Sequence, residues 1–186
     1  QFTKESYHQA FDAVNYDTEF AKDRGYEYPQ QIADIFSLHS NAYDTPVLDV
    51  GSGTGLVALT MREHHAIDSQ LTIDGVDISP EMLEVSKKKN LYRQLFERDL
   101  SQSIELPKNH YGAVVSAGTF THGHVGPDAL NEVLRVVKKG GPVVISVNLG
   151  FWKLKAFDVV VDRLSKTVHS IDLKYVTIYG ENSKGE

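Results

Sequence analysis

The chain has 186 residues, 41% of them hydrophobic, and its formal net charge is −6 at pH 7; a chain of this size can bury one core, so we expect a single domain over residues 1–186. It contains no cysteine, which excludes disulfides, thiolate metal ligands and a cysteine nucleophile. The negative charge gives no general attraction to nucleic acid, so we expect no nucleic acid partner. No apolar run approaches the length of a membrane span, and the first residues are too polar for a signal peptide. We therefore expect a cytoplasmic protein without a membrane partner.

The chain before the first expected strand is predicted to form a helical cap or lid. We expect helices over Phe2–Val14 and Pro29–Leu38, and apolar residues recur at helical spacing in the second. Between them lie Tyr16, Tyr26 and Tyr28, in polar, turn-rich stretches. Such a composition suits a loop that lies over a ligand.

The stretch Val47–Gly55, which reads VLDVGSGTG, is the most informative in the sequence. An apolar run followed by alternating glycines predicts a strand, a tight turn and a helix start, where a ligand can approach the backbone and free N–H groups. The G-x-G-x-G spacing differs from the G-x-G-x-x-G of NAD-binding proteins, whose glycines serve a pyrophosphate. Asp49 stands before the turn, where a carboxylate repels a pyrophosphate but pairs with a cationic group such as an amino-acid ammonium.

Two further strands that end in an acid follow this turn. Leu71–Asp77 is predicted to be the second strand, and Ser79 is expected to cap the helix that Pro80 begins. Tyr92–Leu100 is predicted to be the third strand, ending in Asp99 and Leu100. The basic run Lys87 to Lys89 stands at the end of the intervening helix, where cations interact favourably with the helix dipole.

The remaining elements continue the alternation of strand and helix. In chain order we expect a strand at Tyr111–Gly118, a helix at Gly126–Val137, a strand near Val143–Ser146, a helix at Lys153–Ser165 and a sixth strand at Leu173–Tyr179. We expect Trp152 to pack into the core at the start of the last helix.

This order predicts an α/β fold, with a mostly parallel, twisted sheet and helices on both faces. Residues 1–44 would form the cap and residues 45–186 the core. Right-handed crossovers bring the carboxyl ends of the strands, and with them Asp49, Asp77, Asp99 and Ala117, to one edge. We expect the functional site at that edge.

Taken together, these landmarks resemble the class I S-adenosylmethionine (SAM)-dependent methyltransferases. The glycine turn resembles their motif I, and the strands ending at Asp77 and Asp99-Leu100 resemble their ribose-binding and adenine-binding positions. Within the class, the chain resembles the Williams-Beuren syndrome region methyltransferase-like group, through Tyr-Arg-x-Leu before Asp99 and Ser-Ala-Gly-Thr-Phe-Thr-His-Gly-His at 116–124. The match covers roughly Tyr16 to Gly180, with Ser52 where many relatives have cysteine.

The resemblance implies a Rossmann-like fold, SAM as cofactor and S-adenosylhomocysteine as its product. It also implies that the family's last, antiparallel strand is missing from the printed chain or that the fold is trimmed. The glycines would shape the methionine and ribose cradle, and a tyrosine of the lid would face the sulfonium. The expected cofactor-binding residues are Asp49, Gly51, Ser52, Gly53, Gly55, Asp77, Ile78, Asp99, Leu100, Ala117, Tyr16 and Tyr28.

His122 and His124 are the candidate catalytic residues, because they follow the fourth strand and histidine can take a proton near neutral pH. The competing interpretation is that they satisfy turn or cap hydrogen bonds before the next helix. His-x-His without a third ligand nearby falls short of the usual ligand count, so no metal is expected.

We therefore predict a SAM-dependent methyltransferase acting on a small-molecule acceptor. One alternative is a SAM-binding regulatory or adaptor protein without turnover, since no catalytic side chain is unmistakable. Another is an NAD-dependent oxidoreductase, which the glycine spacing and Asp49 disfavour.

Overall fold

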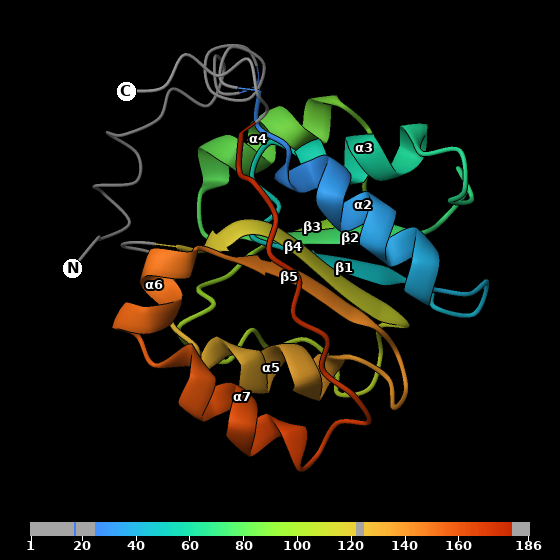
Figure 1. The fold of residues 1–186 in the computed structure, drawn as a ribbon. Helices are drawn as coiled ribbons and strands as arrows, with labels where there is room; N and C mark the ends of the chain where they lie inside the picture. Colours follow the sequence, from blue (N-terminus) through green and yellow to red (C-terminus); the bar gives the residue numbers. More distant parts are fainter. Residues whose placement is uncertain (1–16, 18–24, 122–124, 180–186) are drawn as a thin grey trace.

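A computed structural model describes residue 17, residues 25–121 and residues 125–179, and its centre is a five-stranded sheet (Figure 1). The strand order is β3-β2-β1-β4-β5 and every neighbouring pair is parallel. The strands are β1 Val47–Val50, β2 Ile73–Asp77, β3 Gln94–Glu97, β4 Ala113–Phe120 and β5 Val143–Val147. The helices are α2 Tyr28–His39, α3 Leu56–Glu63, α4 Pro80–Lys88, α5 Ala129–Val136, α6 Leu149–Leu154 and α7 Phe157–Ser165. None of the helices in these ranges is long and apolar enough to cross a membrane.

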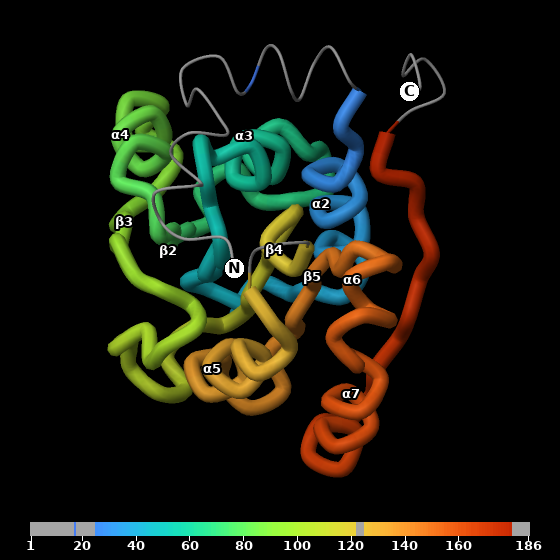
Figure 2. Tube along the Cα trace, turned by 90° about the vertical axis from the view of Figure 1, so that its left-hand side faces the viewer, coloured from blue at the N-terminus to red at the C-terminus, as the bar shows by residue number. Residues whose placement is uncertain are grey.

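The predicted α/β class with a parallel sheet is confirmed. Figures 1 and 2 show α2, α3 and α4 on one face of the sheet and α5, α6 and α7 on the other. The strand order reverses at β1, because β2 and β3 lie on one side of it and β4 and β5 on the other. In open α/β sheets a ligand binds beyond the carboxyl ends of the strands at such a reversal.

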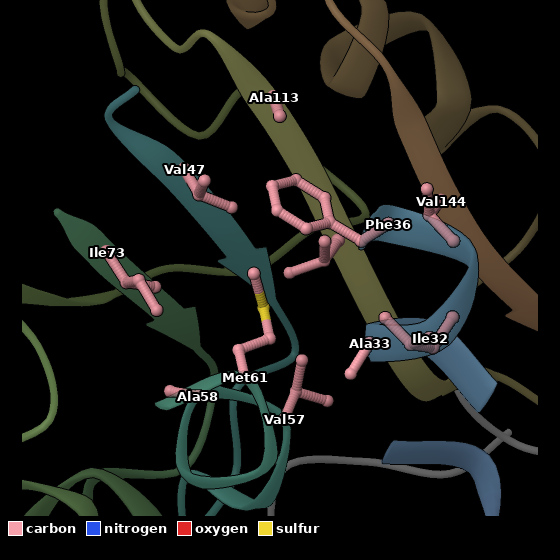
Figure 3. Packing of buried hydrophobic residues seen from close by; sticks show 11 residues of the cluster. Ile32, Ala33, Phe36, Val47, Val57, Ala58, Met61, Ile73, Ala113 and Val144 are labelled. Carbon is pink, nitrogen blue, oxygen red and sulfur yellow. The ribbon is translucent and has the colours of Figure 1, made fainter. Parts of the chain in front are cut away.

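Side chains of β1 alternate between two hydrophobic clusters, one on each face of the sheet. Val47 packs with α2 and α3, in the cluster that Figure 3 shows, whereas Leu48 and Val50 pack with α5. Burial of each such side chain stabilises the fold by about 1.5–3 kcal/mol. Since side chains alternate along a strand, Asp49 points to the same face as Val47, toward α2 and α3.

The start and end of α4 agree with the predictions. The Ser79 hydroxyl accepts a hydrogen bond from the Met82 backbone at 3.2 Å, so Ser79 caps the helix, and Pro80 is its first residue. Lys87 and Lys88 occupy the last turn, which is the favourable position for cations near a helix carboxyl end.

The predicted helix at Lys153–Ser165 is confirmed from Phe157 to Ser165, where α7 lies, but its start is wrong because a separate helix, α6, ends at Leu154. Asn148 caps α6, and Ala156 takes a left-handed conformation with φ 51° between α6 and α7. Phe151 and Phe157 are both buried and their ring centroids are 5.7 Å apart. Six residues along one continuous helix would point these two rings about 120° apart, so the break lets both enter the same cluster.

The predicted sixth strand at Leu173–Tyr179 is also wrong. The residues are extended but most of their side chains are exposed, and only Tyr179 forms a bridge, antiparallel to Tyr26. The Glu27 backbone N–H donates to the Ile178 carbonyl at 2.9 Å. The segment after α7 thus returns to the start of α2 (Figure 1) without joining the sheet.

Candidate functional site

The glycine turn joins the end of β1 to the start of α3, and its three glycines have different surroundings. Gly51, Gly53 and Gly55 have φ values of 68°, 51° and 92°, which disfavour any side chain. A Cβ on Gly51 would lie 2.0 Å from the Thr119 hydroxyl, whereas a Cβ on Gly53 would meet no atom of the described residues within 4 Å. The backbone at Gly53 is therefore open to an incoming group.

Asp77, the last residue of β2, ties the glycine turn to α4. One carboxylate oxygen accepts from the Gly53 N–H at 2.8 Å and the other from the Ser79 N–H at 2.9 Å. The side chain is buried, and burial raises its pKa although these hydrogen bonds partly oppose the rise. Asp77 thus lies at the predicted edge and fixes the shape of the turn.

Asp49 is fully buried beside Asp77, and among the described residues it has a single hydrogen-bond partner. Its Oδ2 accepts from the Tyr92 hydroxyl at 2.6 Å, and within the described part of the chain its Oδ1 has no partner. Burial raises the pKa of Asp49 to about 7, the Tyr92 hydrogen bond lowers it and the nearby Asp77 carboxylate raises it. A buried, unfilled acceptor of this kind favours a cationic or N–H donor group as its partner.

Ser52 belongs to the glycine turn, and its side chain is buried against β2. Its backbone N–H and that of Gly51 both donate to the Val76 carbonyl, at 3.0 and 2.8 Å. A Cβ on Gly75 would lie 2.9 Å from the Ser52 hydroxyl oxygen, so Gly75 makes room for this side chain. Among the described residues that hydroxyl has no hydrogen-bond partner.

The carboxyl end of β4 is irregular where it passes the turn. Its pairing with β5 shifts between Ser116 and Phe120, and Ala117 in this stretch is half-buried. The Ser116 and Thr119 hydroxyls both donate to the Val50 carbonyl, at 2.6 and 2.9 Å, and so bind β4 to the end of β1. Such irregularities are common beside functional sites because they redirect side chains.

Asp99 and Leu100 follow β3, with Ile78 after β2 on the same edge. Asp99 accepts from the Ser101 N–H at 2.8 Å and the Gln102 amide at 3.2 Å. Burial alone would raise the pKa of Asp99, but these hydrogen bonds hold it below its usual value. Leu100 is buried in the cluster on the α5 face, whereas Ile78 is half-buried.

Aromatic residues cover β4 from the start of α2. The Tyr26 ring lies 5.5 Å from that of Tyr28 and 6.4 Å from that of Tyr179, between centroids. A Cβ on Gly118 would lie 2.5 Å from the Tyr26 hydroxyl oxygen, and the φ of 74° at this residue also favours glycine. Tyr28 itself is buried, and burial raises its pKa.

Asp17 contacts the glycine turn, which the sequence did not indicate. It accepts from the Thr54 hydroxyl at 2.5 Å and forms an ion pair with Lys89 at the end of α4. The other predicted residues of the cap and of the loop after β4, Tyr16, His122 and His124, lie outside the described residues.

The structure therefore brings Asp49, Asp77 and the glycine turn together, with Asp99 at the end of the next strand along the same edge. Sequence reasoning missed Tyr92 and Asp17, whose partners are far away in the chain. Tyr92 had been assigned to the third strand, but it precedes β3 and its hydroxyl reaches β1.

Comparison with known proteins finds a match to the family model described as a methyltransferase domain, over residues 47–141. Methyltransferase-like protein 27 of Homo sapiens is 32% identical over 147 residues, which are 76% of this chain and 58% of that protein. The ubiquinone/menaquinone biosynthesis C-methyltransferase UbiE of Geotalea daltonii is 31% identical over 104 residues, or 53% of this chain and 43% of that protein. The chain thus spans about half the length of these curated relatives.

Solved structures share the fold at lower sequence identity. A putative SAM-dependent methyltransferase from Methanococcus maripaludis has a TM-score of 0.55 and 23% identity, over 89% of this chain and 72% of that one. A putative methyltransferase of Haloferax volcanii, solved in complex with the Trm112 methyltransferase activator, has a TM-score of 0.58 and 20% identity. That match covers 75% of this chain and 59% of the other.

Proposed function

Because this chain belongs to the methyltransferase domain family, we propose that it transfers the methyl group of SAM to a small-molecule acceptor, with S-adenosylhomocysteine as the other product. The fold of the described residues is the Rossmann-like fold of class I SAM-dependent methyltransferases. The observation that carries the proposal is the buried Asp49 carboxylate beside the glycine turn, at the reversal of the strand order. The narrower assignment to the Williams-Beuren region group stays a prediction.

The residues at this edge fit the chemistry of SAM. Gly53 leaves its backbone open, which allows close approach of a ligand. The Oδ1 of Asp49, which has no partner among the residues that the structure describes, is a buried acceptor that would receive the ammonium group of the methionine part. Asp77 and Asp99 would serve the ribose hydroxyls and the adenine amino group, as the sequence predicted.

When bound, SAM supplies a methyl group that its sulfonium has already activated, so the protein has mainly to position and shield the reactants. The glycine turn and Asp77 would hold the cofactor, and Asp17, joined to Thr54 and Lys89, would hold the cap against the turn. His122 and His124 stay the candidates to take a proton from the acceptor. The net charge of −6 supports a small molecule over a nucleic acid as acceptor.

Titration calorimetry tests the cofactor part of this proposal. We expect SAM and S-adenosylhomocysteine to bind and NADH not to bind. Asp77→Ala should weaken the binding of SAM and of S-adenosylhomocysteine by about tenfold or more, because the backbone N–H groups of Gly53 in the glycine turn and of Ser79 before α4 lose their acceptor. Thermal unfolding of the variant checks that it is folded. A folded protein that binds NADH but neither SAM ligand would contradict the proposal.

Methyl transfer from labelled SAM to a panel of small-molecule acceptors separates an enzyme from a SAM-binding adaptor. For an enzyme that uses His122 or His124 as a base, substitution by alanine should lower kcat by about 10²-fold or more and leave the Kd for SAM unchanged. SAM binding without transfer to any acceptor would favour the adaptor.

A further inference from the structure

Tyr92 lies between α4 and β3, and its side chain packs against the cluster that contains residues of α3 and reaches β1. Its hydroxyl donates to Asp49 Oδ2 at 2.6 Å. The ring fits because Gly55 has no side chain: a Cβ there would lie 3.2 Å from Tyr92 Cε2. The sequence separates the phenol from the carboxylate by 43 positions, so the fold alone brings them together.

The surroundings of Tyr92 keep its proton in place. Burial and the adjacent Asp49 carboxylate raise the pKa of Tyr92 well above its usual value, and the backbone of Ala58 in α3 only partly opposes this rise. The phenol is therefore neutral at physiological pH and acts as a donor to Asp49.

As a result, the two carboxylate oxygens of Asp49 differ in their hydrogen bonding. Oδ2 is held by Tyr92, whereas Oδ1 is buried and has no partner in the described part of the chain. A carboxylate with one oxygen held cannot rotate freely, so the second oxygen keeps a fixed place. A fixed, buried acceptor is what a cationic ligand group requires for strong binding.

We propose that Tyr92 is a positioning residue for the cofactor: its hydroxyl holds Asp49 Oδ2 and thereby keeps Asp49 Oδ1 in place for the amino group of the methionine part. This inference rests on the proposed function, because it names how the same site selects its cofactor. Tyr92 acts through Asp49 and does not itself touch the reacting groups.

The titration of Asp49 supports this role. The groups acting on it in the described residues are Tyr92 before β3 and Asp77 on β2; no group on α3 or β4 contributes. The Tyr92 hydrogen bond favours the charged carboxylate, while burial and Asp77 favour the neutral acid. Loss of the hydroxyl would therefore leave Asp49 more protonated near neutral pH and less able to bind a cation.

Tyr92→Phe tests the proposal, because it keeps the ring against Gly55 and removes only the donor. The ligands are S-adenosylhomocysteine, which carries the amino group, and methylthioadenosine, which lacks the amino-acid part. We expect the affinity for the first to fall about tenfold and that for the second to change less than about twofold. An equal loss for both ligands, or no loss for either, would overturn the proposal.

Tyr111→Phe is the matched control, since it also removes a buried phenol that donates to a buried aspartate. Tyr111 donates to Asp74 at 3.1 Å and packs in the cluster on the α5 face of the sheet, whereas Tyr92 packs against the cluster on the other face. The ratio of the two affinities should stay at its unaltered value in this variant. A change of the ratio as large as in Tyr92→Phe would indicate a general packing effect and overturn the proposal.

The unaltered protein provides a second test if Tyr92→Phe does not fold. The preference for S-adenosylhomocysteine over methylthioadenosine should fall as the pH falls through the Asp49 pKa of about 7, because the cation then has to displace a proton. A preference that is constant from about pH 5.5 to about pH 8.5 would overturn the inference. Binding of neither ligand by the unaltered protein would overturn the proposed function as well, whereas binding without the preference overturns only the role of Tyr92.

Discussion

Two fully buried carboxylates lie on neighbouring strands, and their hydrogen bonding differs sharply. Asp74 on β2 accepts from Arg93 Nε at 2.9 Å, from Arg93 Nη2 at 2.6 Å and from the Tyr111 hydroxyl at 3.1 Å. Asp49 on β1 has only Tyr92, and its Oδ1 is left without a partner among the described residues. Tyr92 and Arg93 are adjacent, so one short segment holds both carboxylates.

The difference distinguishes two uses of a buried charge. The fold fully neutralises Asp74, as a charge that serves only to join strands requires. It leaves one oxygen of Asp49 without a hydrogen bond among the described residues, which lowers the stability of the free protein. Binding of a cationic group can restore this lost stability. The following substitutions alter one carboxylate at a time.

The largest effect on stability is expected from Arg93→Met, which removes the charged partner of Asp74. We expect the free energy of unfolding to fall by about 2–4 kcal/mol, because Asp74 keeps only Tyr111 as a donor. The lower end is favoured, since the Arg93 side chain is 44% exposed and solvent weakens the pair. Urea unfolding measures this change. A loss below about 0.5 kcal/mol would show that Arg93 is not needed to neutralise Asp74.

Asp49→Asn is expected to have the opposite sign. The pKa of Asp49 is raised from 3.8 to about 7 in the folded state, so the folded chain holds a proton that the unfolded chain has released. Its contribution to the free energy of unfolding therefore falls as the pH rises from about 4 to about 7. Asparagine carries no charge, so the variant should be more stable than the unaltered protein by about 1–3 kcal/mol at pH 8 and should show no gain near pH 4.

Urea unfolding of the ligand-free protein at both pH values measures this gain. The same variant should bind S-adenosylhomocysteine at least about tenfold more weakly, because the ammonium loses its charged partner. If Asp49→Asn is less stable than the unaltered protein at pH 8, the buried charge of Asp49 does not destabilise the folded state.

The smallest effect is expected from Tyr111→Phe, which removes one of three hydrogen bonds to Asp74. We expect a loss of about 0.5–1.5 kcal/mol, because Arg93 still holds both oxygens. Urea unfolding measures this loss of stability, and titration of S-adenosylhomocysteine checks that the variant, which leaves Asp49 unaltered, keeps its affinity. A loss as large as that of Arg93→Met would mean that the phenol, and not the guanidinium, satisfies Asp74.

Local patterns in the sequence predicted much of the fold and part of the site. The glycine turn, the acid that ends β2 and the Ser79 cap each depend on neighbouring residues, so they can be read without tertiary information. The break between α6 and α7 could not be read, because it depends on two phenylalanines packing into one cluster. Apolar residues recur at helical spacing on both sides of the break, so the spacing predicted one continuous helix.

The partners of the site residues depend on the sheet register. Asp49 was singled out because it precedes the glycines, but its contact with Tyr92 requires β2 to lie between β1 and β3. Asp17 likewise meets Thr54 and Lys89 only once the fold brings these positions, 37 and 72 residues away in the sequence, to the same place. Pairings of this kind leave no periodic signal in the sequence.

The packing of Trp152 has a spectroscopic consequence. It is the only tryptophan in the sequence, and its ring stacks on Phe157 with centroids 5.7 Å apart and an angle of 23° between the planes. Selective excitation of indole emission therefore reports on a single place, the contact between α6 and α7. The unfolding of every variant above can be followed there through one intrinsic fluorophore, without any added label.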